Sequence, residues 1–191
     1  MPRIIAGTRK GMNLFSPPGK TSRLTSGRAK EALFSMIGDE IEGTRVLDVF
    51  AGSGQIAFEA LSRGAARATL IERDRDAIAA INKNIGKTRW SDLVVLMTGD
   101  YRRHLATLKR RGEEFDFIYV DPPWSETEVL TLQICDYLPS LLADSGLLVV
   151  ESERKKPVLE LEEAGLKLVK SCQYGISVLS FYRFDTTSDT P

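Results

Sequence analysis

The chain of 191 residues is long enough for one domain with a full hydrophobic core, because 42% of its residues are hydrophobic. It has no apolar run of the roughly 18 residues that a membrane helix needs, and its first residues lack the apolar core of a signal peptide. Two cysteines and a single histidine are too few for a disulfide framework or for a metal site built on His or Cys. These observations predict a cytoplasmic, metal-free protein that does not contact a membrane.

Charge is balanced over the whole chain, with 26 basic and 26 acidic residues, but it is spread unevenly. Residues 1–30 hold seven bases and no acid, which leaves 19 bases against 26 acids in the rest of the chain. A basic segment on an acidic body favours a polyanionic partner for that segment. Charge alone leaves open the alternative of a solvated, flexible N-terminus.

Two short apolar runs at residues 4–7 and 12–15 flank a turn and predict a basic β-hairpin, which forms an N-terminal extension over residues 1–22. Thr25 or Ser26 can cap a helix that follows this extension. The main domain is expected over residues 23–184. The polar residues 185–191 are expected to form a disordered tail.

From residue 45 onward, apolar strands alternate with helical patterns, which predicts a doubly wound, Rossmann-like α/β fold. The predicted strands are residues 45–50, 68–72, 93–97, 115–120 and 147–150. The predicted helices are residues 55–63, the segment around 78–85, residues 101–111, the segment around 129–138, and residues 157–165. Residues 166–172 and 176–184 are joined by a short link and are expected to form an antiparallel hairpin that completes a mostly parallel, seven-stranded sheet.

The first of these strands runs into a glycine-rich turn, whose residues are Asp48-Val49-Phe50-Ala51-Gly52-Ser53-Gly54. Gly52, Gly54 and Ala57 fit the dinucleotide pattern G-x-G-x-x-A, in which glycines let a ligand approach the backbone at a helix N-terminus. Asp48 stands at the carboxyl end of the strand, where open parallel sheets bind ligands. An ordinary strand-to-helix connection is the alternative. A P-loop is excluded because no Gly-Lys-Ser/Thr follows.

Acidic residues end the next two strands. Glu72 follows Gly54 by 18 residues and can accept hydrogen bonds from the hydroxyls of a ribose. Asp100 can accept a hydrogen bond from an adenine amine, and Tyr101 can offer a flat face to the ring. Glu72 and the glycines together indicate a cofactor that contains adenosine. Without such a cofactor, Glu72 would be a surface acid and Asp100 would cap the helix that follows it.

The stretch Asp121-Pro122-Pro123-Trp124 directly follows the buried strand at residues 117–120. The two prolines fix φ and donate no N–H, so the loop presents a carboxylate and a rigidly held carbonyl to one amine. The adjacent aromatic ring can stack on a flat base. The stretch therefore predicts an exocyclic NH₂ as the nucleophile, with catalysis by positioning and electrostatics. The alternative is a turn that ends the strand and buries Trp124.

The order of these motifs resembles class I S-adenosylmethionine-dependent methyltransferases and, more narrowly, the RsmD family of guanine-N2 methyltransferases of small-subunit ribosomal RNA. The resemblance extends over residues 3–184. Besides the motifs above, it rests on residues 3–7, 23–28, 31–34, 59–65 and 174–175. It implies transfer of a methyl group from S-adenosylmethionine to the N2 amine of a guanine in 16S ribosomal RNA, with S-adenosylhomocysteine as the product.

The resemblance also implies roles for individual residues. The cofactor would be bound by Asp48, Phe50, Ala51, Gly52, Ser53, Gly54, Glu72, Arg73, Asp100, Tyr101 and Asp121. The target guanine would be bound by Asp121, Pro122, Pro123 and Trp124, with Trp124 stacked on the base. The RNA would be contacted by Arg3, Arg9, Lys10, Arg23, Thr25 and Arg28. The implied partner is ribosomal RNA within the small subunit or its assembly intermediate, and a monomer is expected.

Leu24, Gly27 and Trp124 depart from the family pattern, which usually has Pro, Asp and Tyr or Phe at these positions. Other functions are also compatible with some of the motifs. An adenine-N6 methyltransferase shares the Asp-Pro-Pro-aromatic loop, whereas a nicotinamide-dependent oxidoreductase shares the glycine pattern but not that loop. A non-catalytic RNA-binding protein is the alternative outside the enzymes.

Overall fold

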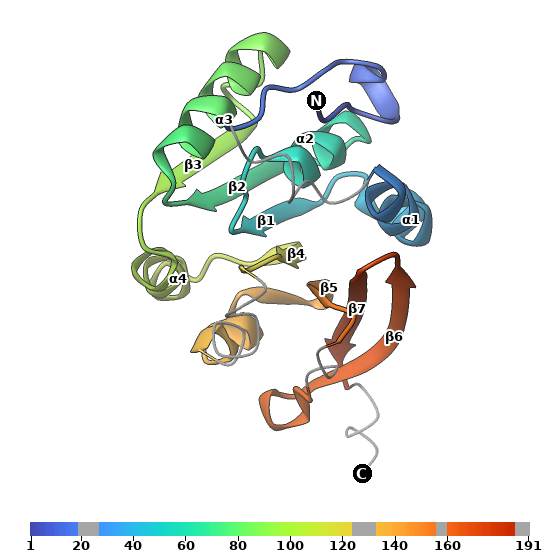
Figure 1. Cartoon of the computed structure of the whole chain (residues 1–191). Helices are drawn as coiled ribbons and strands as arrows, with labels where there is room; N and C mark the ends of the chain where they lie inside the picture. Colours follow the sequence, from blue (N-terminus) through green and yellow to red (C-terminus); the bar gives the residue numbers. More distant parts are fainter. Residues whose placement is uncertain (19–26, 124–132, 156–159, 186–191) are drawn as a thin grey trace.

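Figure 1 shows the computed structural model, which describes residues 1–18, 27–123, 133–155 and 160–185. Its strands are β1 (Arg45–Val49), β2 (Arg67–Glu72), β3 (Val94–Thr98), β4 (Phe115–Val120), β5 (Leu142–Glu153), β6 (Leu166–Tyr174) and β7 (Ser177–Phe184). The longer helices are α1 (Gly27–Ile37), α2 (Gln55–Ser62), α3 (Arg75–Thr88) and α4 (Tyr101–Arg110). Short 3₁₀ helices are η1 (Gly7–Arg9), η2 (Gly38–Ile41), η4 (Leu138–Ser140) and η5 (Glu162–Ala164).

These strands form one seven-stranded sheet in the order β3-β2-β1-β4-β5-β7-β6. The first five strands along the chain pair in parallel, and β7 is antiparallel to both β5 and β6. The chain moves outward from β1 to β3 and then returns to β4 on the other side of β1. The order therefore reverses between β1 and β4, which is the switch point where open α/β sheets bind ligands. The predicted doubly wound sheet with a C-terminal antiparallel hairpin is confirmed.

Apolar side chains cover both faces of the sheet, as buried parallel strands require. One core includes Phe34 of α1, Phe58 of α2 and Ile81 of α3, which lie together on one face (Figure 1). The other core includes Leu105 of α4 and Leu138. Helix α4 lies on the face of the sheet opposite α2 and α3 (Figure 1). None of the described helices combines the length and the apolar character needed to cross a bilayer.

All eight residues of α2 are buried, because the N-terminal segment (residues 1–18) packs against this helix. Ile4 and Leu14 of that segment are fully buried in the core that contains α2. The N-terminal segment is therefore a packed part of the domain. This finding contradicts the alternative of a solvated and flexible N-terminus for the residues that the structure describes.

The N-terminal segment pairs as a hairpin, but in a shorter form than the apolar runs suggest. Its two halves meet in one antiparallel bridge between Arg3 and Asn13, with the Ile4 N–H donating to the Met12 carbonyl at 2.9 Å. A longer ladder does not form here because the backbone N–H groups of Ile5 and Ala6 donate to a side chain of α2 instead. The turn contains η1.

Three further expectations need adjustment. β5 begins at Leu142 rather than at residue 147, because a register shift against β4 admits residues 143–146 (Ala-Asp-Ser-Gly) into the strand. Of the helix expected at residues 157–165, the described part contains η5, which ends at Gly165 in the left-handed region (φ 73°). Of the helix expected around residues 129–138, residues 133–135 are helical and η4 follows. Residues 124–132, 156–159 and the expected tail at 186–191 lie outside the described residues.

Candidate active site

A cavity of about 260 Å³ lies at the switch point, at the carboxyl ends of β1, β2 and β4. Its wall is formed by Pro17, Asp48, Phe50, Ala51, Gly52, Ser53, Gln55, Ile56, Ile71, Glu72, Arg73, Asp74, Ala77, Gly99, Tyr101, Tyr119, Asp121 and Pro123. The structure thus brings the glycine-rich turn, the end of β2 and the Asp121 loop to one cavity. Of the residues predicted to bind the cofactor, Gly54 and Asp100 are not in this wall.

The glycine-rich turn (residues 48–54) is shaped by left-handed backbone conformations. Phe50, Gly52 and Gly54 have φ values of 67°, 57° and 74°, and Gly54 is the N-cap of α2. A Cβ on Gly54 would lie 2.8 Å from side-chain atoms of Leu70 and Phe58, so this position requires glycine. Phe50 has a side chain, and its left-handed conformation costs on the order of 1–3 kcal/mol, a type of strain that clusters at functional sites.

Glu72 holds the turn against the end of β2. One carboxylate oxygen accepts a hydrogen bond from the Gly52 N–H at 2.7 Å, and the other accepts from the N–H groups of Arg73 at 2.7 Å and Asp74 at 2.8 Å. A carboxylate has about four lone-pair sites, so Glu72 keeps acceptor capacity for one further donor. Glu72, which is predicted to bind a ribose, is thus seen to order the turn, a role that the sequence did not reveal.

Asp48 is 2% exposed, and its Oδ2 atom has no hydrogen-bond partner among the described residues. Burial raises the pKa of this carboxyl to about 7, the Glu72 charge adds to the rise, and a hydrogen bond from the Ala57 backbone opposes it. A buried carboxylate oxygen without a partner is costly. A cationic group of a ligand in the cavity would supply that partner and would favour the charged carboxylate.

Aromatic side chains line another part of the cavity. The rings of Phe50 and Tyr101 are 5.0 Å apart at their centroids and are tilted by 55°. Tyr101 is 4% exposed, and its hydroxyl donates a hydrogen bond to Gln133 at 2.7 Å. The ring of Tyr101 is therefore fixed at the cavity wall, where it can contact a flat ligand.

Asp100 lies between two residues of the wall, Gly99 and Tyr101, but its side chain has other partners. Its carboxylate caps α4 through the Arg102 N–H at 2.9 Å and pairs with the Arg102 guanidinium at 2.9 Å. These interactions with Arg102 lower the pKa of Asp100 to about 2. The capping role that the sequence left open is thus observed, and a contact between Asp100 and adenine stays a prediction.

The loop that begins at Asp121 adjoins the glycine-rich turn. The Asp121 N–H donates to the carbonyl of Val49 at an N···O distance of 3.4 Å, which links the end of β4 to the end of β1. Asp121 and Pro123 line the cavity, whereas Pro122 is buried beside it. Trp124, predicted to stack on the target base, lies outside the described residues.

The residues predicted to contact RNA are placed unevenly. Arg3, Arg9, Lys10 and Arg28 are all exposed, but Arg9 also has partners within the protein. The side chain of Arg9 donates to the Thr88 carbonyl at 3.3 Å and lies 5.9 Å from the ring centroid of Trp90. Arg23 and Thr25 lie outside the described residues.

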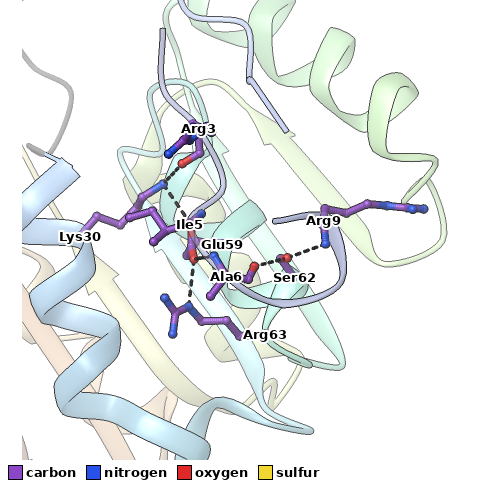
Figure 2. Close-up of polar contacts among 8 residues, drawn as sticks. All are labelled: Arg3, Ile5, Ala6, Arg9, Lys30, Glu59, Ser62 and Arg63. Carbon is purple, nitrogen blue, oxygen red and sulfur yellow. Dashed lines mark hydrogen bonds and ion pairs between the residues drawn. The ribbon is translucent and has the colours of Figure 1, made fainter. Parts of the chain in front are cut away.

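Two polar groups that position the N-terminal segment escaped the sequence analysis. Glu59 of α2 is fully buried and accepts from the Ile5 and Ala6 N–H groups, at 2.8 and 3.0 Å, and from Lys30 at 3.1 Å (Figure 2). Asn84 of α3 is also fully buried and bonds Phe15. A charged residue in the middle of a mostly apolar helix was the available signal for Glu59, but its backbone partners Ile5 and Ala6 are more than 50 residues away in sequence.

In the part of the chain that the structure describes, no group of three or more His, Cys, Asp or Glu side chains is arranged to hold a metal ion.

Comparisons with known proteins identify the family of the chain. The sequence matches the family model "Conserved hypothetical protein 95" over residues 2–183. It is 35% identical over 155 residues to ribosomal RNA small subunit methyltransferase D of Escherichia coli K12, covering 79% of this chain and 74% of the relative. The protein of the same name from Haemophilus influenzae is 31% identical over 162 residues, covering 84% and 83%. The solved structure of yhhF from Escherichia coli has a TM-score of 0.80 at 32% identity and covers 97% of this chain and 98% of its own. The chain therefore belongs to the RsmD family of methyltransferases.

Proposed function

We propose that this enzyme transfers a methyl group from S-adenosylmethionine to the exocyclic N2 amine of a guanine in 16S ribosomal RNA. The observation that carries the proposal is the shared cavity of the glycine-rich turn and the Asp121 loop, at the switch point of the sheet. The names of the relatives, ribosomal RNA small subunit methyltransferase D, support the substrate class.

The polar groups of the cavity fit this cofactor. The Oδ2 atom of Asp48 offers a buried acceptor to the α-amino group of the methionine part. Glu72 retains acceptor capacity for a ribose hydroxyl, and the rings of Phe50 and Tyr101 offer apolar contact to adenine. When bound, S-adenosylmethionine supplies an electrophilic methyl group on its sulfonium.

Asp121 and Pro122 would orient the target amine. The lone pair of a guanine N2 is conjugated with the ring, so the amine is a weak nucleophile until the nitrogen becomes pyramidal and its lone pair leaves that conjugation. The two N–H groups of the amine would donate hydrogen bonds to the carboxylate of Asp121 and the carbonyl of Pro122, which favours tetrahedral geometry at nitrogen. The same carboxylate would stabilise the positive charge that develops on N2 and accept the proton that leaves it.

The remaining parts of the proposal concern the RNA. Trp124 would stack on the flipped base, because every base offers a flat face to an aromatic ring. The exposed side chains of Arg3, Lys10 and Arg28 would contact phosphates. The reaction would take place in the cytoplasm, on the small subunit or its assembly intermediate, with the enzyme acting as a monomer.

A reconstituted reaction tests the proposed product. Small-subunit particles from a strain that lacks the protein are incubated with the purified enzyme and S-adenosylmethionine, and their RNA is digested to nucleosides for mass spectrometry. We expect N2-methylguanosine to increase. An increase of N6-methyladenosine instead would support the adenine-N6 alternative. If neither the particles nor free small-subunit RNA, incubated in the same way, gained any methylated nucleoside, the proposal would be contradicted.

A further inference from the structure

Asn84 of α3 connects two parts of the molecule that are far apart in sequence. Its side-chain amide donates to the carbonyl of Phe15 and to the carbonyl of Ser53, both at 3.1 Å. Its amide oxygen accepts a hydrogen bond from the Phe15 N–H at 2.7 Å. Asn84 is fully buried, so both of its N–H donors are used inside the protein.

Both partners of Asn84 belong to the cavity region. Ser53 lies in the glycine-rich turn and in the cavity wall, between two glycines that have left-handed conformations. Phe15 belongs to the N-terminal segment, and Pro17, two residues further on, lies in the same wall. The N-terminal segment thus contributes to the cavity directly, and Asn84 fixes the segment and the turn relative to each other.

Other side chains hold the N-terminal segment at a greater distance from the cavity. Figure 2 shows the carboxylate of Glu59 at the centre of bonds from Ile5, Ala6, Lys30 and Arg63. Lys87, on the same helix as Asn84, donates to the carbonyl of Asn13 at 2.7 Å. Lys87 is exposed and contacts the N-terminal segment, so it offers a matched comparison for Asn84.

The glycine-rich turn needs such support. Its left-handed conformation at Phe50 is strained, and strain of this kind persists where the surroundings determine the backbone. A buried carbonyl that loses its donor must find another or move. Without Asn84, the Ser53 carbonyl and the Phe15 backbone would both lose a buried partner, and this direct link between the turn and the N-terminal segment would be lost.

We propose that Asn84 is a positioning residue of the cofactor site, which couples the order of the N-terminal segment to cofactor binding. The inference rests on the proposed function, because it assumes that S-adenosylmethionine binds in this cavity. Coupling between two sites is reciprocal. Cofactor binding should therefore protect the N-terminal segment, and loss of Asn84 should weaken cofactor binding.

The test uses the full chain and three variants, Asn84→Ala, Asn84→Asp and, as control, Lys87→Ala. Asn84→Asp has nearly the same shape, keeps an acceptor for the Phe15 N–H and can make at most one of the two donated bonds, so it serves if Asn84→Ala fails to fold. S-adenosylhomocysteine binding is measured by isothermal titration calorimetry. Backbone amide exchange over residues 4–15 is measured with and without this ligand.

We expect both Asn84 variants to bind S-adenosylhomocysteine about tenfold more weakly, and Lys87→Ala to bind it within about twofold of the unsubstituted chain. The ligand should slow amide exchange over residues 4–15 in the unsubstituted chain and in Lys87→Ala, but not in the Asn84 variants. If Asn84 contributed only to the stability of the fold, its variants would melt at a lower temperature, but the ligand would still slow amide exchange over residues 4–15.

Retained protection together with unchanged affinity in the Asn84 variants would overturn the inference while leaving the proposed function intact. If the unsubstituted chain does not bind S-adenosylhomocysteine, the proposed cofactor is wrong, and the inference is overturned with it.

Discussion

The carboxyl group of Asp48 has the most unusual environment of the cavity residues. It is buried, one of its oxygens has no partner among the described residues, and burial raises its pKa to about 7, well above the ordinary value of an aspartate. Because the folded protein holds this proton more tightly than the unfolded chain, the stabilisation from protonated Asp48 is complete below about pH 4. It is lost as pH rises through about 7. A bound cation would reverse this preference for the protonated form.

The titration of Asp48 predicts how cofactor binding depends on pH. If the α-amino group of the cofactor pairs with ionised Asp48, S-adenosylhomocysteine should bind more tightly as pH rises from 5.5 to 7.5, by up to about tenfold per pH unit below the pKa. Calorimetric titrations at several pH values measure this. Asp48→Asn should remove most of the dependence.

Asp100→Asn is the control for this measurement, because the pKa of Asp100 is lowered to about 2 and lies outside the range of the titrations. The pH dependence should persist in that variant. An affinity of the unsubstituted chain that does not change between pH 5.5 and 7.5 would refute the pairing with Asp48.

At the scale of elements, the N-terminal segment is held on α2 by a close backbone approach. Gly7 has φ 78°, and a Cβ at this position would lie 1.7 Å from the carbonyl oxygen of Ser62. Gly11, in the same segment, has φ 87°, but a Cβ there would meet no atom within 4 Å. The two glycines share a backbone conformation but differ in their surroundings. Alanine at Gly11 therefore measures the cost of the backbone conformation alone, whereas alanine at Gly7 also displaces the segment.

Gly7→Ala should therefore displace the N-terminal segment from α2, whereas Gly11→Ala should cost on the order of 1 kcal/mol of unfolding free energy from its left-handed conformation alone. Limited trypsin digestion detects the difference, because Arg9 and Lys10 provide cleavage sites in the segment. We expect cleavage at least about tenfold faster in Gly7→Ala than in Gly11→Ala. Equal rates for both variants would show that the close approach to Ser62 does not hold the segment.

The sequence predicted the central strands and the glycine-rich turn because these depend on local patterns. β4, for example, has the same bounds as the predicted strand, since all of its residues except Asp116 are apolar or aromatic and buried. The attachment of the N-terminal segment depends on distant partners. Lys30 counts as one of seven bases in the charge analysis, yet it is 2% exposed and bonds the Arg3 carbonyl and Glu59. Nothing in the neighbourhood of Lys30 in the sequence indicates that burial.

The arrangement of the candidate site could be predicted to a similar extent, and the features that could not be predicted depend in the same way on distant partners. Asp48, Glu72 and Asp121 stand at strand ends, and the topology of a parallel sheet brings such ends together, so their common cavity follows from their positions in the sequence. Asp100 also stands at a strand end, but Arg102 two residues later engages its carboxylate. The roles of Pro17 and Asn84 require the folded N-terminal segment, which no local pattern specifies.

For the whole molecule, the uneven distribution of charge predicts that reversing charges on the N-terminal segment weakens RNA binding but not cofactor binding. Arg3 and Lys10 are exposed on the N-terminal segment, away from the cavity wall. Replacing both with Glu should weaken RNA binding by about tenfold or more at 50 mM salt and reduce the salt dependence of that binding, because contacts with phosphates release counterions. Filter binding to small-subunit RNA over a range of salt concentrations measures both effects.

The same double variant should bind S-adenosylhomocysteine within about twofold of the unsubstituted chain, since neither side chain reaches the cavity wall. A parallel loss of RNA and cofactor affinity would mean that the substitutions disturb the fold rather than a surface that contacts RNA.

The central claim is that the glycine-rich turn and the Asp121 loop bring a methyl donor and an amine together. Single-turnover methyl transfer to small-subunit particles, combined with S-adenosylhomocysteine titration, tests it most directly in Asp121→Asn, with the exposed Glu114→Gln as control. We predict that Asp121→Asn lowers the rate of transfer by about 10²–10³-fold while cofactor affinity changes less than about fivefold, and that Glu114→Gln changes neither. Transfer by Asp121→Asn at the rate of the unsubstituted enzyme would contradict the claim.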